Sequence, residues 1–343
     1  MIAPMKRADV NFTYLKNIGL AGKNSEVYLA KDEHLDAEVA IKEVKKSSID
    51  VANYFREARL LYASRHPNIV SINYACQDQD NIYVCMPFYQ NGTVSDRMEN
   101  ENLTAREIIR YSINFLSGLH HIHSKSLMHF DIKPNNIMLS ERDEAMLSDF
   151  GLAKHLDPNG FATPDAAYTI HYPPEIFTRS KFNIAYDIYQ AGMTIYRMAV
   201  GTKVFEDEIN ALLADTSKAA DKITTGAFPK KTFEPHIPKP LRKIIIKCLS
   251  INPADRYQSA LDVLNALSAI DDNVCLDWRK DDTPTHYVWS KPLQEAKMVL
   301  RVDKTTSECE LYKLASDGTK RRDKPNCRPA VTESDIYMIL KAK

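Results

Sequence analysis

Short apolar runs alternate with polar residues over the first quarter of the chain, and this texture is typical of β-strands. Three such runs can be read, at 26–30, 38–42 and 81–86. Between the second and third runs, residues 51–64 have the apolar spacing of a helix instead. We therefore predict a small domain rich in strands over residues 11–89, preceded by a short N-terminal segment, 1–10.

Residues 90–270 carry the patterns of helices. Thr104 and Glu107 have the spacing of a capping box, in which each side chain bonds the backbone N–H of the other residue. Apolar residues then follow at helical spacing, namely Ile109, Ile113, Leu116 and Leu119. A second apolar stretch, 187–200, is followed by Gly201, and glycine often ends helices. We predict a second, mainly helical domain.

The last part of the chain, residues 271–343, changes character again. It opens with acidic, turn-rich stretches and continues with strand-like runs at 287–289, 298–302 and 309–314. An Asp317-Gly318 turn follows, and Thr332 and Asp335 have capping-box spacing at the start of a closing helix. We predict a small α+β module here.

Composition excludes some classes of protein and leaves others open. Hydrophobic residues make up 44 % and charged residues 26 %, which is ordinary for a globular protein. Lys+Arg and Asp+Glu both number 45, so no global positive charge points to nucleic acid or to a membrane surface. The six cysteines are scattered, which favours reduced thiols over a disulfide framework. With no signal peptide or long apolar stretch, the pattern favours a cytoplasmic protein.

The most specific polar pattern is the run His129-Phe-Asp-Ile-Lys-Pro-Asn-Asn136. Phosphoryl transfer needs a hydroxyl held in line, a γ-phosphate held still, and Mg²⁺ to neutralise the developing charge. Asp131, Lys133 and Asn136 would supply a base, a counter-charge for the phosphate and a metal ligand from one loop. A polar surface turn is the alternative for this run taken alone.

A second candidate metal ligand follows at a fixed distance. Asp149-Phe-Gly151 begins thirteen residues after Asn136. Mg²⁺ favours one or two carboxylates together with phosphate oxygens, so Asp149 is a candidate ligand beside Asn136. The tripeptide alone often marks no more than a turn, and its distance from Asp131 is what makes it specific.

Together these motifs resemble the eukaryotic-type protein kinase family over about residues 12–268. The resemblance implies an α+β fold of two lobes, with residues 271–343 as an appendage. It implies ATP and Mg²⁺ as cofactors and proteins as substrates. In the family, a lysine at the position of Lys133 favours serine/threonine over tyrosine specificity.

Further residues can be assigned from this resemblance. Val39-Ala-Ile-Lys42 resembles the motif whose lysine contacts the α- and β-phosphates of ATP, and Glu57 occupies the place of its helix partner. Without the resemblance, Lys42 and Glu57 would be interpreted as a surface pair worth about 0–1 kcal/mol. Glu175, at the end of Tyr172-Pro-Pro-Glu175, and Arg256 are similar to a structural ion pair of the family.

The resemblance also implies a nucleotide site. The glycine loop is degenerate, with Gly19 and Gly22 present and Ser25 in place of the last glycine. The implied adenine contacts are Val27, Ala40 and Met138 above and below the base, Met86 as the gatekeeper and Phe88 in the hinge. For the apolar members of this set, core packing is an equally good interpretation.

One substitution separates this chain from many family members. Phe130 precedes Asp131, where an arginine usually binds a phosphate on the activation segment. Because Phe130 cannot bind phosphate, we expect activity not to require phosphorylation of Thr163, Tyr168 or Thr169. Thr169 best matches the threonine that hydrogen-bonds the catalytic aspartate, although the alignment could slip by one residue.

Two other functions must be weighed against an active kinase. A pseudokinase scaffold would have no need to keep the base and both metal ligands. Kinase-like enzymes that act on small molecules generally lack a lysine at the position of Lys133 and lack the activation segment.

For residues 271–343 we expect contact with a partner or a regulatory role. A basic run, Lys320-Arg-Arg322, lies near aromatics there and is a candidate for binding nucleic acid or an acidic partner, but surface charges at a hairpin tip above a small aromatic core are the favoured interpretation.

Overall fold

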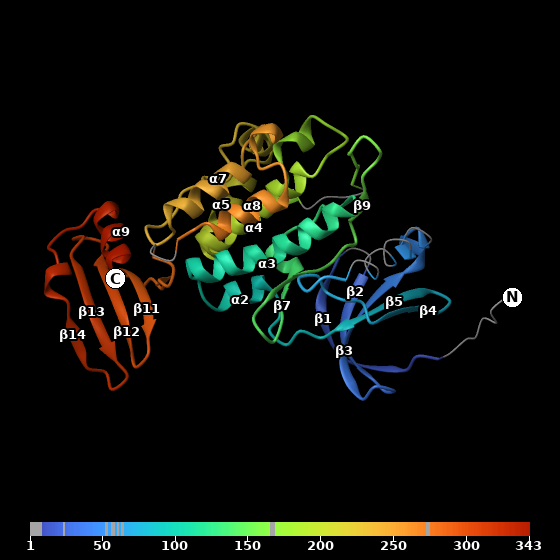
Figure 1. Cartoon of the computed structure of the whole chain (residues 1–343), viewed down its shortest axis with the longest axis horizontal. Coiled ribbons are helices and arrows are strands. Elements are labelled where there is room, and N and C mark those ends of the chain that lie inside the picture. The colour runs from blue at the N-terminus through green and yellow to red at the C-terminus, as the bar shows by residue number, and fades with distance from the viewer. Residues whose placement is uncertain are drawn as a thin grey trace. The chain divides into compact units, whose positions relative to one another are not determined.

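The computed structural model describes residues 9–22, 25–51, 54–55, 59, 62, 65–164, 169–271 and 275–343. By its internal contacts the chain divides into two compact units, Met1–Gln90 and Asn91–Lys343. The first unit contains the small lobe, and the second contains the large lobe and the C-terminal module (Figure 1).

The small lobe is built on an antiparallel sheet with the strand order β1-β2-β3-β5-β4. Its strands are β1 (Phe12–Gly22), β2 (Ser25–Asp32), β3 (Ala37–Lys45), β4 (Tyr74–Gln77) and β5 (Asn81–Pro87). One face buries Ala30, Val39, Ile41 and Cys85 in a common cluster. The strands predicted from the apolar runs are confirmed. The helix predicted at 51–64 falls mostly outside the described residues.

The large lobe is mainly helical, as predicted. Its helices are α2 (Val94–Asn100), α3 (Ala105–Ser124), α4 (Ala185–Val200), α5 (Thr202–Leu213), α6 (Ala219–Thr224), α7 (Lys239–Cys248) and α8 (Ala260–Ser268). The capping box of Thr104 and Glu107 starts α3, and Gly201 ends α4 with a φ of 82°.

Helix α4 is the buried centre of this lobe. Nearly all of its residues are buried, and it packs on α3, α5 and α7. At Gly192 an added Cβ would lie 2.4 Å from the Cβ of Cys248 on α7. Glycine is therefore required there, because the two helices approach too closely for any side chain.

Two short pairs of strands lie within the connection between α3 and α4. Strand β6 (Leu127–Met128) pairs with β9 (Lys154–His155), and β7 (Ile137–Leu139) pairs with β8 (Ala145–Leu147). The segment that contains His129–Asn136 runs from β6 to β7, and Asp149 follows β8 directly. These pairings bring the two polar motifs to the same side of the lobe.

The C-terminal module is a five-stranded antiparallel meander covered on one face by a helix. Its elements are β10 (Arg279–Lys280), β11 (His286–Leu293), β12 (Ala296–Asp303), β13 (Cys309–Ala315), β14 (Lys320–Arg322) and α9 (Glu333–Ala342). Trp278, Trp289, Leu300, Leu311 and Ile339 are among the residues of its own apolar core. The predicted α+β module and its capping box at Thr332 are confirmed.

The module is joined to the large lobe by specific contacts. The backbone N–H of Arg106 on α3 donates to the carbonyl of Leu276 (2.9 Å), and Arg106 also pairs with Asp277 (2.5 Å). Arg279 pairs with Glu107, the residue that caps α3 (3.0 Å). Asn102, Gly201, His236, Lys280 and Lys304 line part of a cavity of about 650 Å³ at this junction. The module is thus packed on the lobe rather than tethered to it.

The fold class predicted from the sequence is confirmed: a sheet-rich lobe, a helical lobe and a small α+β appendage. All six cysteines are free thiols. Among the described residues, none of the helices is both long and apolar enough to cross a membrane.

Candidate active site

In the small lobe, several predicted site residues share one face of the sheet. Gly19 pairs with Val27, and Val27 pairs with Lys42 on the next strand. A Cβ added to Gly19 would lie 2.7 Å from the Cβ of Val27, so β2 crosses this glycine too closely for a side chain. The pairing of β1 with β2 therefore requires a glycine at position 19.

Apolar side chains lie on the same face of the sheet as Val27 and Lys42. Ala40 pairs with Met86, and Ala40 lies two residues before Lys42 on β3, so the two side chains point to the same face. Gly22 pairs with Ser25 where β1 turns into β2, and Phe88 follows the end of β5. Glu57, the predicted partner of Lys42, lies outside the described residues.

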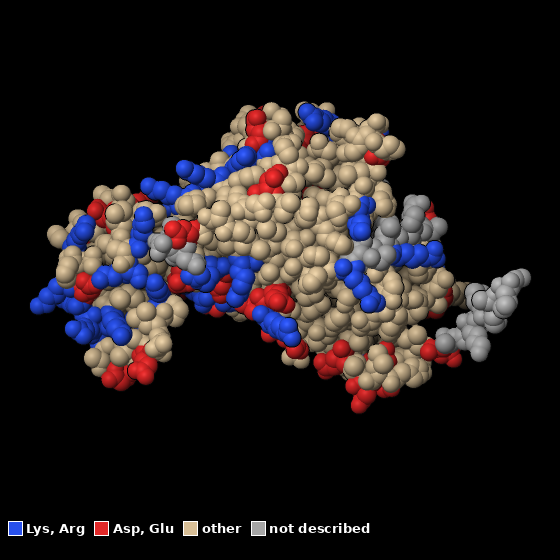
Figure 2. Space-filling view, viewed as in Figure 1, with Lys and Arg blue, Asp and Glu red and all other residues tan. Residues whose placement is uncertain are grey.

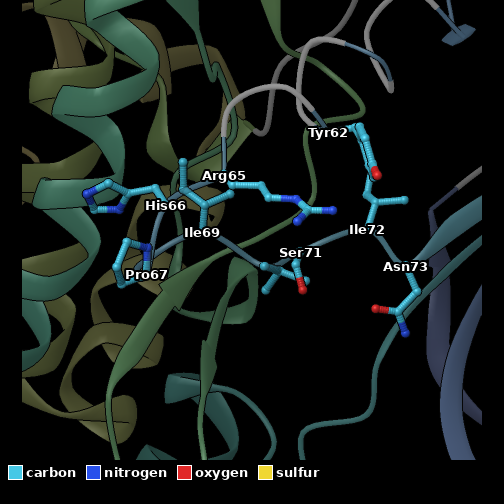
Figure 3. Close-up of a pocket in the computed structure, with 9 residues that line it drawn as sticks. Tyr62, Arg65, His66, Pro67, Ile69, Ser71, Ile72 and Asn73 are labelled. Atoms are coloured by element: carbon cyan, nitrogen blue, oxygen red, sulfur yellow. The ribbon is translucent and has the colours of Figure 1, made fainter.

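The small lobe also has a pocket of about 540 Å³ that includes none of these residues among its described lining. Its walls come from Tyr62 and from the stretch 65–73, and Figure 3 shows Arg65 extending toward Tyr62. The guanidinium carbon of Arg65 lies 4.8 Å from the centre of the Tyr62 ring. This pocket is separate from the face that carries Lys42, and we assign it no nucleotide contact.

In the large lobe, the structure brings together the three polar residues of the predicted catalytic loop. Nζ of Lys133 donates to both carboxylate oxygens of Asp131, at 3.0 and 2.8 Å. Nδ2 of Asn136 donates to the carbonyl oxygen and to Oδ2 of Asp131, both at 2.8 Å. Asp131 is 7 % exposed, so its carboxylate is held in one place by these donors.

Helix α4 supplies the polar groups that hold this loop. Asp187 accepts hydrogen bonds from the backbone N–H groups of His129 and Phe130, both at 2.9 Å. One turn later, Gln190 accepts from the N–H of Ile132 (3.2 Å) and donates to the carbonyl of Phe130 (3.0 Å). The irregular backbone around Asp131 is therefore satisfied by side chains of a buried helix.

Thr194 completes this set from the same face of α4, because residues 187, 190 and 194 are spaced three and four apart. Its hydroxyl donates to the carbonyl of Ile132 (3.2 Å), and Nδ1 of His171 lies 2.9 Å from the same oxygen. The other ring nitrogen of His171 faces Nη1 of Arg197 (3.2 Å). Burial, with a further contribution from Arg197, holds the pKa of His171 well below its ordinary value.

The buried charge of Asp187 is stabilised by its donors. Burial alone would raise the pKa of this carboxyl, but the hydrogen bond with Nε2 of His123 (2.8 Å) and the backbone donors outweigh burial, and the pKa is lowered. Asp187 is therefore ionised, and its charge faces the amides of the catalytic loop.

His129 links the loop to the segment of Asp149. Its Nδ1 accepts a hydrogen bond from the N–H of Asp131 (3.2 Å), so Nε2 carries the proton and donates to the carbonyl of Ser148 (3.0 Å). Burial lowers the pKa of His129, which agrees with a neutral ring. The ring also packs on Phe150, with centroids 4.8 Å apart.

The candidate oxygen ligands for a cation belong to Asn136 and Asp149, and Oδ1 of Asp149 accepts a hydrogen bond from the N–H of Gly151 (3.3 Å). Because Asn136 turns Nδ2 toward Asp131, its Oδ1 has no hydrogen-bond partner among the described residues although the side chain is only 6 % exposed. Asp149 is exposed, and the N–H of Ser148 beside it donates to the carbonyl of Asn136 (2.9 Å). An amide oxygen and a carboxylate oxygen are among the oxygen ligands that Mg²⁺ prefers.

Phe130 takes part in apolar packing. It has a φ of 64° and is fully buried in a cluster with Met128, Ala162, Phe182 and Tyr186. Its ring lies 5.1 Å from that of Tyr186 in an edge-on arrangement. Ala162 of the activation segment (149–175) and Phe182, which follows the end of that segment, form two backbone hydrogen bonds (2.8 and 2.9 Å), so the segment around Ala162 lies beside Phe130.

The predicted ion pair at the end of this segment is confirmed. Arg256 donates from Nη1 and Nη2 to the two oxygens of Glu175, at 2.7 and 2.6 Å. Both residues are buried, and the guanidinium lies over the ring of Tyr189. Two parallel bonds of this kind fix the orientation of both groups.

Sequence reasoning missed the residues that support the loop from a distance, namely His123, His171, Gln190 and Thr194. A signal did exist for two of them, because Gln190 and Thr194 are polar positions at helical spacing from Asp187 in an apolar stretch. Met138 is on β7, opposite Met146, in the same lobe as Asp131. Tyr168 lies outside the described residues, and so does the side chain of Thr169.

A strand-rich lobe, a helical lobe, and a loop that holds an aspartate, a lysine and an asparagine together define the class of the protein kinases. The family model for the protein kinase domain matches residues 12–267. The chain belongs to the protein kinase family.

Curated relatives agree with this class. The chain is 30 % identical over 271 residues to a probable serine/threonine-protein kinase of Clostridium acetobutylicum, covering 76 % of this chain and 40 % of the relative. It is also 30 % identical over 268 residues to the serine/threonine-protein kinase PrkC of Bacillus subtilis, covering 75 % and 40 %. The chain thus spans about 40 % of the length of these relatives.

Proposed function

We propose that this protein is an active serine/threonine kinase that transfers the γ-phosphate of ATP to hydroxyl groups of protein substrates. The observation that carries the proposal is the arrangement of Asp131, whose carboxylate is bonded by Lys133 and Asn136 on a loop held by α4. A substrate hydroxyl placed against Asp131 would be oriented by it and would give it a proton. Such general-base assistance is typically worth about 10²–10⁴ in rate.

Other residues of the large lobe have supporting roles in this proposal. Lys133, now paired with Asp131, would steady the γ-phosphate when it arrives. Asn136 and Asp149 would hold Mg²⁺, which when bound neutralises charge on the transferred phosphoryl group. The free Oδ1 of Asn136 and the exposed carboxylate of Asp149 support this assignment.

The small lobe would bind the nucleotide. Lys42 would contact the α- and β-phosphates, with Glu57 as its partner, and the strand turn at Gly19, Gly22 and Ser25 would cover them. Val27, Ala40, Met86 and Met138 would contact the adenine, and Phe88 would contribute hinge backbone. The common sheet face of Val27, Ala40, Lys42 and Met86 supports this part of the proposal.

Independence from activation-segment phosphorylation is part of the same proposal. A kinase with an arginine before the catalytic aspartate needs a phosphate to compensate that charge, whereas Phe130 has no charge to compensate. The apolar cluster of Met128, Phe130, Phe182 and Tyr186, together with the backbone bonds between Ala162 and Phe182, would order the part of the segment around Ala162.

The alternatives make different predictions for the same experiment. The protein is incubated with labelled ATP and Mg²⁺, alone and with a cell lysate, beside Asp131→Asn and the control Asp207→Asn, an exposed aspartate on α5. An active kinase labels proteins, Asp131→Asn loses at least about 10²-fold while still binding ATP, and the control is unchanged. A pseudokinase would label nothing, and a small-molecule phosphotransferase would consume ATP without labelling protein.

A further inference from the structure

The sheet of the C-terminal module has two unlike faces. Helix α9 covers the face that carries Trp289, Leu300 and Leu311. Because side chains alternate along a strand, the opposite face carries Arg279 of β10, Lys297, Arg301 and Asp303 of β12, Glu310 and Tyr312 of β13, and Lys320 and Arg322 of β14. We call this second surface the outer face.

The strand register gathers the charges of the outer face around Tyr312. Its direct cross-strand neighbours are Val299 on β12 and Arg322 on β14. Lys297 and Arg301 flank Val299 at a spacing of two, and Lys320 flanks Arg322 in the same way. Four cationic side chains therefore surround one aromatic ring, whose centre lies 3.9 Å from Nζ of Lys320.

This cationic cluster is only partly neutralised. Glu310 is its carboxylate, and it pairs with both Lys320 (2.6 Å) and Arg322. Lys297 is exposed and has no ion-pair partner among the described residues, and the Arg322 side chain is 67 % exposed. Arg301 is directly opposite Glu310, so a single carboxylate lies among the four cations, and an anionic partner would supply further counter-charge.

The part of the outer face on β12, β13 and β14 is free of the large lobe, whereas Arg279, at the β10 edge of the same face, pairs with Glu107. The module meets the lobe through the stretch from Leu276 to Lys280, through Trp289 and through Tyr337 of α9. Among the described residues, the hydrogen bonds and ion pairs of the side chains of Arg301, Glu310, Lys320 and Arg322 stay within the module. Figure 2 shows Lys and Arg side chains over the part of the module where Figure 1 places β13 and β14.

The kind of anionic partner follows from the aromatic ring. Proteins that bind single-stranded nucleic acid offer exposed aromatic faces on which bases stack. Tyr312 is only 8 % exposed and its ring is already covered by Lys320. The surface therefore offers charge without a stacking platform, which fits carboxylate side chains of a protein better than bases.

We propose that the outer face binds acidic segments of protein substrates and so recruits them to the kinase. The substrate part of this statement rests on the proposed function, whereas the binding part rests on the charges alone. Because the sites are exposed, each ion pair should contribute modestly and weaken with salt.

Binding is tested on the full chain with a labelled peptide of Glu and Asp, a matched peptide of Gln and Asn, and a single-stranded RNA of equal charge. Lys297→Gln/Arg322→Gln removes two cations from the outer face. The matched control Lys313→Gln/Arg321→Gln removes two exposed cations from the same strand region on the opposite face. We expect the first variant to bind the acidic peptide roughly fivefold more weakly, and the control to bind it like the parent.

The proposal would be overturned by equal losses in both variants, or by tighter binding of the RNA than of the acidic peptide. Absence of binding to the acidic peptide would overturn it as well. Folding of each variant is checked by its thermal unfolding, which should match the parent because all four side chains are on the surface.

A kinetic experiment distinguishes the recruitment of acidic substrates from the kinase activity itself. Peptides rich in serine and threonine are given either an acidic or a neutral extension, and kcat/KM is measured for the parent and both variants. The acidic extension should raise kcat/KM in the parent and in the control, and Lys297→Gln/Arg322→Gln should remove that gain without changing the rate on the neutral peptide. Equal phosphorylation of the acidic and neutral peptides would contradict recruitment but not the kinase activity. Binding that depends on charge, without any phosphorylation, would contradict the kinase activity but not the binding surface.

Discussion

Nε1 of Trp289 donates a hydrogen bond to Nδ1 of His236, 3.3 Å away, and this bond joins the C-terminal sheet to the large lobe. The two residues are 1 % and 3 % exposed. Since Nδ1 accepts, the proton of the neutral ring is on Nε2. Burial, with smaller contributions from Lys280 and Arg242, lowers the pKa of His236 to about 3.

This buried histidine should make stability depend on pH. The unfolded chain takes up a proton below about pH 6.5, whereas the folded chain resists it down to about pH 3, so stability is complete above pH 6.5 and falls as the pH drops through that window. At pH 5 the loss due to His236 should be about 2 kcal/mol. Urea unfolding at pH 7.5 and pH 5 measures it.

The control for this effect is His236→Asn, whose Oδ1 can accept the Trp289 hydrogen bond but cannot titrate. His129 and His171 also have lowered pKa values and contribute in the same direction, so the informative quantity is the difference between parent and variant. Equal losses between pH 7.5 and pH 5 in both proteins would show that His236 is not the titrating group.

Removing the donor should weaken the junction between module and lobe. Trp289→Phe keeps most of the apolar volume but leaves Nδ1 of His236 buried without its partner, which should cost about 1–3 kcal/mol of unfolding free energy. Tyr287→Phe is a suitable control, because Tyr287 is on the same strand and is 39 % exposed. A Trp289 variant as stable as the Tyr287 variant would contradict this account.

The apolar cluster of Phe130 predicts activity without a phosphate on the activation segment. Enzyme treated with a phosphatase, and then separated from it, should keep its initial rate within about twofold, since Phe130, which precedes Asp131, has no charge for a phosphate on the activation segment to compensate. Thr163→Ala should behave the same way, with Thr163→Ser as the control that keeps the hydrogen bond to Ser180. Loss of turnover with an unchanged unfolding temperature would show that a phosphate is needed.

Phe130 should also be important for stability. Phe130→Ala removes a fully buried ring from the cluster, and such substitutions cost about 3–5 kcal/mol. Phe130→Leu keeps most of the contact and should cost clearly less. Denaturant unfolding of both variants measures the difference, and similar free energies for alanine and leucine would mean that the ring packs loosely.

The pair of Glu175 and Arg256 should show strong coupling. Glu175→Gln leaves the guanidinium of Arg256 buried without its counter-charge, which should cost about 3–5 kcal/mol. Arg256→Met alone should cost a similar amount for the opposite reason. The double variant should lose much less than the sum, and additive losses would show that the two groups act independently.

The sequence could predict features formed by residues close together in the chain better than contacts between residues far apart in it. Capping boxes at Thr104 and Thr332 are local patterns, and both helices begin there. Asp131, Lys133 and Asn136 are close in the chain, so their common loop could be anticipated from spacing. Gln190 and His171 reach the same loop from 39 to 60 residues away, and contacts at that range depend on how α4 is packed.

The sequence could predict what Phe130 does not do, but not what it contacts. The sequence shows that a phosphate-binding arginine is absent, but not what replaces it. Phe182 and Tyr186 reach Phe130 only once β6, β9 and α4 are in place. In the same way, the outer face of the module depends on strand register, because a slip of one residue would exchange the positions of Arg321 and Arg322.

The bridge between Ala162 and Phe182 has a consequence for motion on the timescale of amide exchange. Both N–H groups are bonded to carbonyls within the apolar cluster that also contains Tyr186 of α4. These two amides can exchange with solvent only when the cluster opens, so they should exchange at rates close to those of α4 and far more slowly than exposed loop amides. The part of the activation segment around Ala162 would then open together with the buried core of the large lobe.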